Sequence, residues 1–241
     1  MAGEVPPERR LFGETWVYES IVGAIPGLGL TDTQAVLVQF GVFEAGVLVL
    51  SAAYGLWNAV VPGTVAVLVA ALGSAFMLDL GSRVRRLDVP ERYRRLLFAS
   101  RIEVVLGLFA YVGLVTYLFV YDPRRGSEPL LRSLLGPEPP LLPTYLLLLV
   151  LWDLCYRIGT GWWAAVVALW RSSRYAFDDE TAAALRAIDL RNAAFGLLQL
   201  ALVPFVAAEP LLVAAVVGHV IAVVTVSGLS VARLRRGAIS S

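Results

Sequence analysis

Long apolar segments alternate with short polar ones along most of the chain. In a helix that rises about 1.5 Å per residue, roughly 20 apolar residues cross a hydrocarbon layer of about 30 Å. Six segments have this length, and we expect each to span a membrane: residues 34–56, 58–80, 97–121, 145–170, 185–207 and 211–232. The pattern predicts an all-α, polytopic membrane protein whose six-helix transmembrane domain covers residues 31–236.

The segments outside the spans have their own patterns. Acidic residues, proline and glycines interrupt the apolar stretch in residues 1–30. This predicts a cytoplasmic N-terminus with an interfacial helix that places Trp16 at the lipid headgroups, or alternatively a re-entrant loop. Residues 122–143 hold six of the 13 prolines, so we expect a stiff outer loop, with a short amphipathic helix at residues 128–135. Residues 237–241 are expected to form a cytoplasmic tail.

The distribution of arginine predicts the orientation of the chain. All 20 basic residues are arginines, and with six spans 14 of them fall on one side of the membrane. The opposite side holds only Arg124, Arg125 and Arg132. Because cytoplasmic loops carry the excess of positive charge, we expect a multi-pass protein of the cell membrane with both termini in the cytoplasm.

The odd-numbered spans resemble one another. Twelve residues after an acid near the helix start, each carries a polar residue: Glu44 after Asp32, Glu103 after Glu91, and Asn192 after Glu180. Apart from Leu48, small or polar residues follow at helical spacing. The likeness suggests three helical hairpin repeats in parallel orientation, with a binding site where the units meet. The alternative is that topology alone places acids at helix starts and arginines at cytoplasmic ends.

The fourth span carries an acid and a base near its middle. Asp153 and Arg157 are four residues apart, so on a helix they share a face and can pair. Charged groups at such depth are costly, and by default they point into the bundle or a wet cavity and mark function. Gly159 and Gly161 follow, and predict either a loosened helix beside a substrate site or close packing against a neighbouring helix.

Polar residues of other spans extend this pair into a candidate network. We predict an ion- or substrate-binding site formed by Glu44, Glu103, Asp153, Arg157, Asp189 and Asn192, with His219 as a candidate proton relay. Further polar groups in or near the spans are Arg101, Arg191 and Gln199. On α-helical spacing, Asp189, Asn192, Gly196 and Gln199 form one inward stripe. The alternative is that all of these groups are paired and only fix how the helices fit together.

Composition excludes several classes of function. Hydrophobic residues make up 58% of the chain, and the net charge of +1 leaves no basic surface for nucleic acid. One cysteine, Cys155, and one histidine cannot build a metal site or an intrachain disulfide. No lysine is present for imine chemistry, and no nucleophile, zinc or phosphate-loop motif appears. We therefore expect no metal and no cofactor, and favour a non-enzymatic role.

The abundance of arginine, the absence of lysine and the alanine- and valine-rich spans resemble uncharacterised six-span integral membrane proteins of haloarchaea. This resemblance is one of composition and topology over the whole chain, and it implies no activity. The leading hypothesis is a small-solute or ion transporter, such as a proton-linked permease, with Glu44 and Asp153 as acceptors and Arg157 as counter-ion. The alternative is a non-catalytic membrane subunit or assembly factor with structural charges. The third is a membrane enzyme acting on a lipid.

The expected partners follow from these hypotheses. They are the lipid bilayer, a small ion or solute, and a second copy of the chain in a homo-oligomer.

Overall fold

The computed structural model describes residues 15–16, 30–126 and 128–236. Within them, six segments are helical, long and apolar enough to cross a membrane, which confirms the predicted all-α membrane bundle. These spans are Asp32–Tyr54, Trp57–Arg86, Glu91–Arg124, Leu141–Arg174, Asp179–Val206 and Pro210–Arg233. Most of the predicted interfacial helix at residues 1–30 and the predicted tail at residues 237–241 lie outside the described residues.

Three spans are single helices, and three combine several elements. The single helices are α1 (Asp32–Tyr54), α6 (Leu141–Arg174) and α8 (Pro210–Arg233). The second span joins η1 (Trp57–Ala59) to α2 (Val60–Arg86), and the fifth joins α7 (Asp179–Leu198) to η4 (Gln199–Val206). The third consists of α3 (Glu91–Phe98), α4 (Ile102–Thr116), η2 (Tyr117–Tyr121) and η3 (Asp122–Arg124). Outside the spans lie α5 (Leu130–Leu135) and two short strands that pair in parallel, β1 (Ala176–Phe177) and β2 (Arg235–Arg236).

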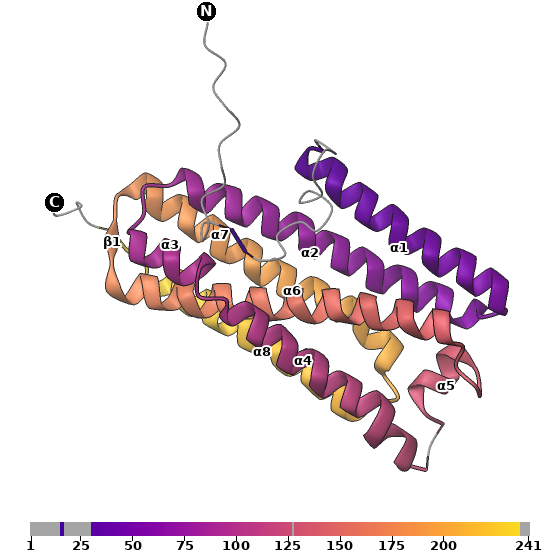
Figure 1. Cartoon of the computed structure of the whole chain (residues 1–241). Helices are drawn as coiled ribbons and strands as arrows, with labels where there is room; N and C mark the ends of the chain where they lie inside the picture. Colours follow the sequence, from indigo (N-terminus) through magenta and orange to yellow (C-terminus); the bar gives the residue numbers. More distant parts are fainter. Residues whose placement is uncertain (1–14, 17–29, 127, 237–241) are drawn as a thin grey trace, which may run out of the picture.

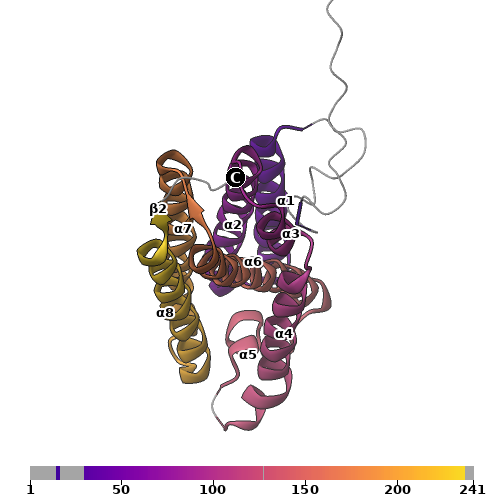
Figure 2. The same cartoon turned by 90° about the vertical axis from the view of Figure 1, so that its left-hand side faces the viewer.

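The spans form three antiparallel hairpins, with α6 at the centre. α1 packs against α2, α4 against α6, and α7 against α8. In addition, α6 contacts α1, α2, α3, α7 and α8, and Figure 2 shows it crossing the middle of the bundle. On the left of Figure 1 lie α3 and β1, among the arginine-rich connections; we call this the arginine-rich end. The opposite end of the bundle, where α5 lies, is the α5 end.

The third span is not the continuous helix that its apolar run predicts. α3 ends at Phe98, α4 begins at Ile102, and between them Arg101 has a positive φ of 56°. A non-glycine residue in this left-handed region does not continue a right-handed helix. The Arg101 side chain is exposed, whereas Glu103 is fully buried. These two charges are thus separated by a change in the direction of the chain.

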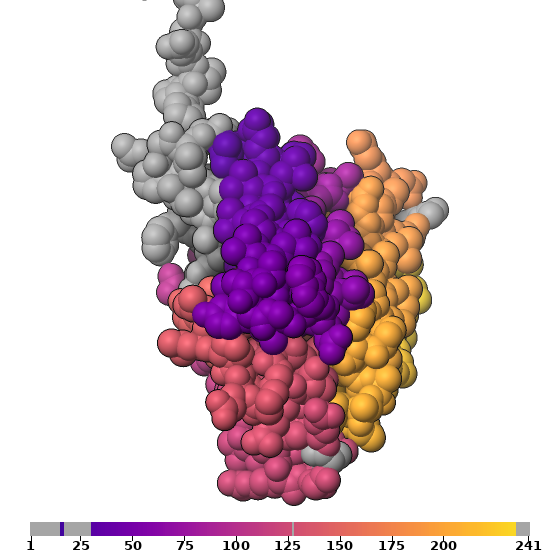
Figure 3. Space-filling model, turned by 90° about the vertical axis from the view of Figure 1, so that its right-hand side faces the viewer, coloured from indigo at the N-terminus to yellow at the C-terminus, as the bar shows by residue number. Residues whose placement is uncertain are grey.

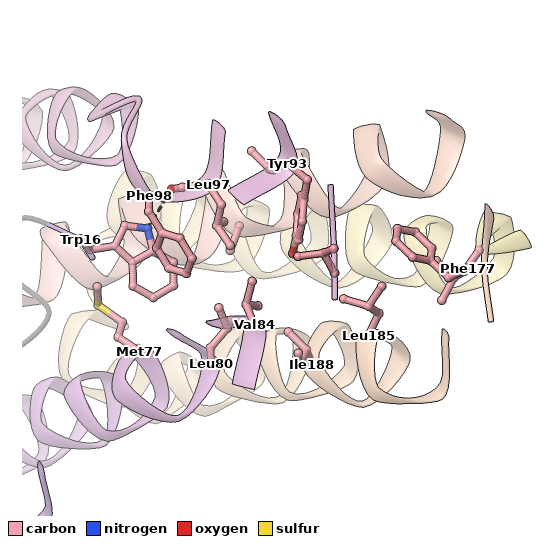
Figure 4. Close-up of a cluster of buried hydrophobic side chains, with 14 of the residues drawn as sticks. Trp16, Met77, Leu80, Val84, Tyr93, Leu97, Phe98, Phe177, Leu185 and Ile188 are labelled. Atoms are coloured by element: carbon pink, nitrogen blue, oxygen red, sulfur yellow. Dashed lines mark hydrogen bonds between the residues drawn. The ribbon is translucent and has the colours of Figure 1, made fainter. Parts of the chain in front are cut away.

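A cluster of buried apolar side chains fills the arginine-rich end. Figure 4 shows side chains from several elements pointing toward one another there, among them Leu80, Phe98 and Ile188. The Trp16 indole joins this cluster: its Nε1 donates to the carbonyl of Leu97 at 3.0 Å, and its ring packs edge-on against Phe98. Trp16 is only 2% exposed. It is a core residue, and its level relative to the lipid headgroups stays a prediction.

α4 and α6 approach each other closely at two glycines. A Cβ atom on Gly159 would lie 2.6 Å from the backbone nitrogen of Gly107 and 2.9 Å from the carbonyl oxygen of Glu103. Small residues allow this kind of backbone contact between membrane helices. Since α6 continues unbroken through Gly159 and Gly161, close packing is the arrangement present here.

The proline-rich connection carries a short amphipathic helix, as predicted. α5 buries Leu131 and Leu135 and exposes Arg132. Asp122 Oδ2 accepts a hydrogen bond of 2.7 Å from the backbone N–H of Leu130. This bond satisfies one of the free N–H groups at the start of α5 and ties the helix to the end of the third span.

We expect Gly159→Ala to lower the free energy of unfolding by about 1–3 kcal/mol, because the added methyl group overlaps the backbone of α4. The midpoint of thermal unfolding in detergent measures this loss. Gly113→Ala on α4 is the matched control, since nothing lies within 4 Å of its added Cβ. Equal midpoints for the two variants would contradict the close contact.

Asp178, which lies before the fifth span, gives a second prediction. Its Oδ1 accepts a hydrogen bond of 2.8 Å from the backbone N–H of Thr181, and the bond lowers the pKa of the carboxyl group below its usual value of 3.8. A lowered pKa stabilises the folded state above pH 3.8, and this contribution is lost as the pH falls through the folded value.

Asp178→Ala should therefore lower the unfolding midpoint at pH 7, and the difference from the unaltered protein should shrink below pH 3.8. Asp178→Asn keeps a capping oxygen without a titrating group, so its smaller loss should not change in this way. A loss in Asp178→Ala that is the same at every pH would refute the role of the carboxylate.

Candidate functional site

The charged pair that the spacing in α6 predicts is present. Arg157 Nη2 lies 2.9 Å from Asp153 Oδ1, and the two side chains are 0% and 8% exposed. The residues are one helical turn apart, so the geometry of α6 alone brings them together.

Two neighbouring helices supply further bonds to this pair. Gln39 on α1 donates from Nε2 to Asp153 Oδ2 at 2.8 Å, and Ser74 on α2 donates to Gln39 Oε1 at 2.9 Å. Arg157 Nη1 lies 2.9 Å from the sulfur of Met77, also on α2. We call these five residues the central network. A cavity of about 10 Å³ adjoins Gln39 and Asp153, which is barely enough for one water molecule.

A second buried pair lies on α6 and α7, closer to the arginine-rich end. Arg171 Nη2 is 2.7 Å from Asp189 Oδ2, and the side chains are 0% and 2% exposed. Ser230 on α8 donates to the same carboxylate oxygen at 2.7 Å, and its hydroxyl lies 2.9 Å from that of Ser172. Arg171 Nη1 donates to the Tyr93 hydroxyl on α3 at 3.3 Å. This second network thereby joins α3, α6, α7 and α8.

The predicted inward stripe of α7 is confirmed. Asp189, Asn192, Gly196 and Gln199 are all buried. Asn192 Nδ2 donates to the backbone carbonyl of Gly161 on α6 at 2.9 Å. The stripe therefore bonds α7 to the central helix at two levels, through Asp189 and through Asn192.

The two glutamates of the predicted site lie elsewhere. Glu44 on α1 accepts a hydrogen bond of 2.8 Å from the Thr64 hydroxyl on α2. Glu103 on α4 is 0% exposed, and neither of its carboxylate oxygens has a hydrogen-bond partner among the described residues. The residue of α1 that contacts Asp153 is Gln39.

The remaining predicted groups are peripheral to the two networks. His219 on α8 faces Trp162 with ring centroids 6.5 Å apart, and its Nε2 has no hydrogen-bond partner in the described part of the chain. Arg191 Nε lies 3.9 Å from Asp79 Oδ2, with both side chains partly exposed. Arg101 is exposed at the helix break.

Several residues of the networks were missed from the sequence. Arg171 directly follows the predicted fourth span, residues 145–170, and so falls in the predicted connection to the fifth, yet the structure buries it inside α6. Its spacing held a signal: Arg157 and Arg171 are 14 residues apart, close to four full turns, so a continuous helix places them on similar faces. Gln39 and Ser74 had no such signal, because their partners lie on other helices.

A further polar cluster at the α5 end was also missed. Glu209, just before α8, is 3% exposed and accepts hydrogen bonds from the Tyr117 hydroxyl and the Arg125 guanidinium. Arg125 Nη1 also donates to the Tyr117 hydroxyl at 2.7 Å. The cluster connects the end of the third span to the start of α8. Arg125 and Glu209 are 84 residues apart, and no local sequence pattern predicts a contact between residues so far apart.

These arrangements hold paired charges inside the bundle. Asp153 and Asp189 are each bonded to an arginine. Within residues 15–16, 30–126 and 128–236, no three His, Cys, Asp or Glu side chains gather in a way that could hold a metal ion. The chemistry that the geometry supports is the pairing of charges, within α6 for Asp153 with Arg157 and between α6 and α7 for Arg171 with Asp189.

Comparison with curated proteins and with solved structures finds no match. The sequence profile of one family matches residues 11–230, from the segment before α1 through most of α8. That family is described as one of unknown function, so the match carries no activity. By this match over most of its length, the chain belongs to the family DUF7530.

Proposed function

We propose that this protein is a non-catalytic integral membrane protein, a subunit or assembly factor, whose buried charges hold its helices in one arrangement. The observation that supports this most is the pairing of both buried arginines with aspartates, Arg157 with Asp153 and Arg171 with Asp189. A side chain from another helix also bonds to each carboxylate: Gln39 of α1 bonds to Asp153, and Ser230 of α8 bonds to Asp189.

The energetics of buried charge favour this role. A charge at the centre of a membrane costs about 3 kcal/mol even on the lenient scale, and removing one member of a buried pair costs about 3–5 kcal/mol. A carrier that used Asp153 would have to break its bonds to Arg157 and Gln39 in every cycle. The adjoining cavity of about 10 Å³ leaves no room for a solute in this arrangement.

Leucine substitutions in the central network test the proposal. Asp153→Leu and Arg157→Leu should each lower the free energy of unfolding by about 3 kcal/mol, because each leaves the other charge buried without its partner. The double variant should recover most of this loss, since replacing a whole buried pair by apolar side chains is often neutral. Thermal unfolding of the purified protein in detergent measures all three.

Asp79 and Arg83 on α2 provide the matched control. They form an acid–arginine pair with the same spacing at 2.8 Å, but their side chains are 39% and 40% exposed. The corresponding single leucine variants should change stability by less than about 1 kcal/mol. If the Asp153–Arg157 double variant were as unstable as its single variants, charge pairing would not be the role of these residues.

A proton-linked permease is the second candidate, and one observation favours it. Glu103 is fully buried, and neither carboxylate oxygen is hydrogen-bonded within the described residues, as in a group that takes up and releases a proton. In that case the site would comprise Glu44, Glu103, Asp153, Arg157, Asp189 and Asn192, with His219 as relay. A small-solute or ion transporter of this kind would need a second arrangement in which Asp153 reaches water.

Proton flux separates the two candidates. The protein is reconstituted in vesicles that contain potassium and a pH-sensitive dye, and valinomycin sets the membrane potential. On the structural proposal, these vesicles acidify no faster than protein-free ones. Acidification that is several-fold faster and is abolished by Asp153→Asn and Glu103→Gln, but not by Asp79→Asn, would overturn the structural proposal in favour of the permease.

A further inference from the structure

A large apolar cavity lies between the spans toward the α5 end. Its volume is about 230 Å³, and none of the residues of the two aspartate–arginine networks lines it. It is lined by residues of α1, η1, α2, α4, η2, α5, α6, η4 and α8. Representative lining residues from these elements are Leu50, Ala66, Leu114, Leu131, Leu147 and Leu212.

The walls of this cavity are almost entirely hydrocarbon. Apart from Ser51 and Cys155, every lining residue is glycine or has a hydrocarbon side chain, and no charged residue lines it. A buried water needs two to four polar partners, and an engineered apolar cavity of about 150 Å³ stays dry and binds benzene. The larger cavity in this protein therefore suits an apolar occupant and excludes a polar solute.

The packing of the spans explains why this space exists. α4 and α8 each pack against α6, and Figure 2 shows α5 between α4 and α8. In Figure 3, which looks onto the α5 end, the pink segment that contains α5 lies against the purple α1–α2 hairpin on one side. The yellow residues of η4 and α8 lie on its other side. Leu131 and Leu135 of α5 are buried and line the cavity, so α5 covers it.

We propose that the cavity holds the hydrocarbon chain of a lipid from the surrounding bilayer. An empty apolar cavity costs stability in proportion to its volume, and lipid chains surround the spans on every side. A flexible chain gains contact with the leucine-rich walls and loses no hydrogen bonds on entering. This inference rests on the cavity alone and does not depend on the role of the buried charges.

Polar groups close in sequence to the cavity lining indicate where the headgroup of such a lipid lies. Leu118 and Val206 line the cavity, and each is close in sequence to a member of the cluster formed by Tyr117, Arg125 and Glu209. The Arg125 side chain is 28% exposed, so its guanidinium is within reach of a phosphate at the membrane surface. The hydrocarbon chain of the lipid would thus extend from the α5 end toward the middle of the bundle.

A photoreactive lipid tests the proposal on the whole protein. The protein is reconstituted in vesicles of dioleoylphosphatidylglycerol. These vesicles contain a small fraction of phosphatidylglycerol that carries a diazirine midway along one acyl chain. After irradiation and digestion, mass spectrometry locates the adducts. We expect adducts on the cavity-lining parts of α5 and α6 that saturate at about one per protein as the fraction of probe rises.

Two substitutions fill the cavity from different walls, Leu147→Trp on α6 and Ala66→Phe on α2. Each should reduce the saturating adducts at least fivefold. Leu149→Trp is the matched control, because Leu149 is two residues from Leu147, 39% exposed and not part of the cavity wall. It should leave these adducts unchanged. If one filling variant fails to fold, the other decides.

Two results would overturn the proposal. One is an adduct yield on α5 and α6 that rises in proportion to the probe without saturating, as for lipid that merely surrounds the bundle. The other is a saturating yield that the cavity-filling variants leave unchanged, which would place the bound chain on another surface.

Discussion

Hydrocarbon offers no hydrogen-bond partner, and this constraint decides which side chains of the protein come together. The backbone meets it by forming helices, whose N–H and C=O groups bond within each segment. The charged side chains meet it by pairing with one another. Asp153 pairs with Arg157 within α6, whereas the pairs Asp189–Arg171 and Glu209–Arg125 join different elements. The three pairs lie at three levels of the bundle, from its middle to its two ends.

The central helix takes part in two of these levels. Arg157 and Arg171 lie about four turns apart on α6, and between them they bond or pack to residues of α2, α3, α7 and α8. Gln39 brings in α1. A change in the tilt of α6 would therefore disturb bonds to several spans at once, which is why we assign the buried charges to the arrangement of the helices.

The bundle is packed differently along its length. Where α4 meets α6, Gly107 and Gly159 let the backbones touch, and no space remains. Toward the α5 end, large apolar side chains of several spans surround a cavity of about 230 Å³ instead. Closely bonded charges and an apolar cavity together suit a membrane protein that keeps one shape and holds a lipid chain. They suit less well a protein that moves a polar solute through its middle.

Much of this architecture follows from the order of residues alone, because helical periodicity is a local property. The six apolar runs specified six spans, the i, i+4 spacing specified the Asp153–Arg157 pair, and the stripe on α7 specified which face of that helix is buried. The short helix α5 was likewise evident within its proline-rich connection.

Other features were decided only by the tertiary structure. The bond between Gln39 and Asp153 joins residues 114 positions apart, and the burial of Arg171, the helix break at Arg101 and the apolar cavity depend on how separate spans fit together. The periodicity of one helix states which face turns inward, but not which residue of another helix that face meets. That choice depends on side-chain volumes, glycine contacts and hydrogen bonds between spans, and these exist only after the helices have packed.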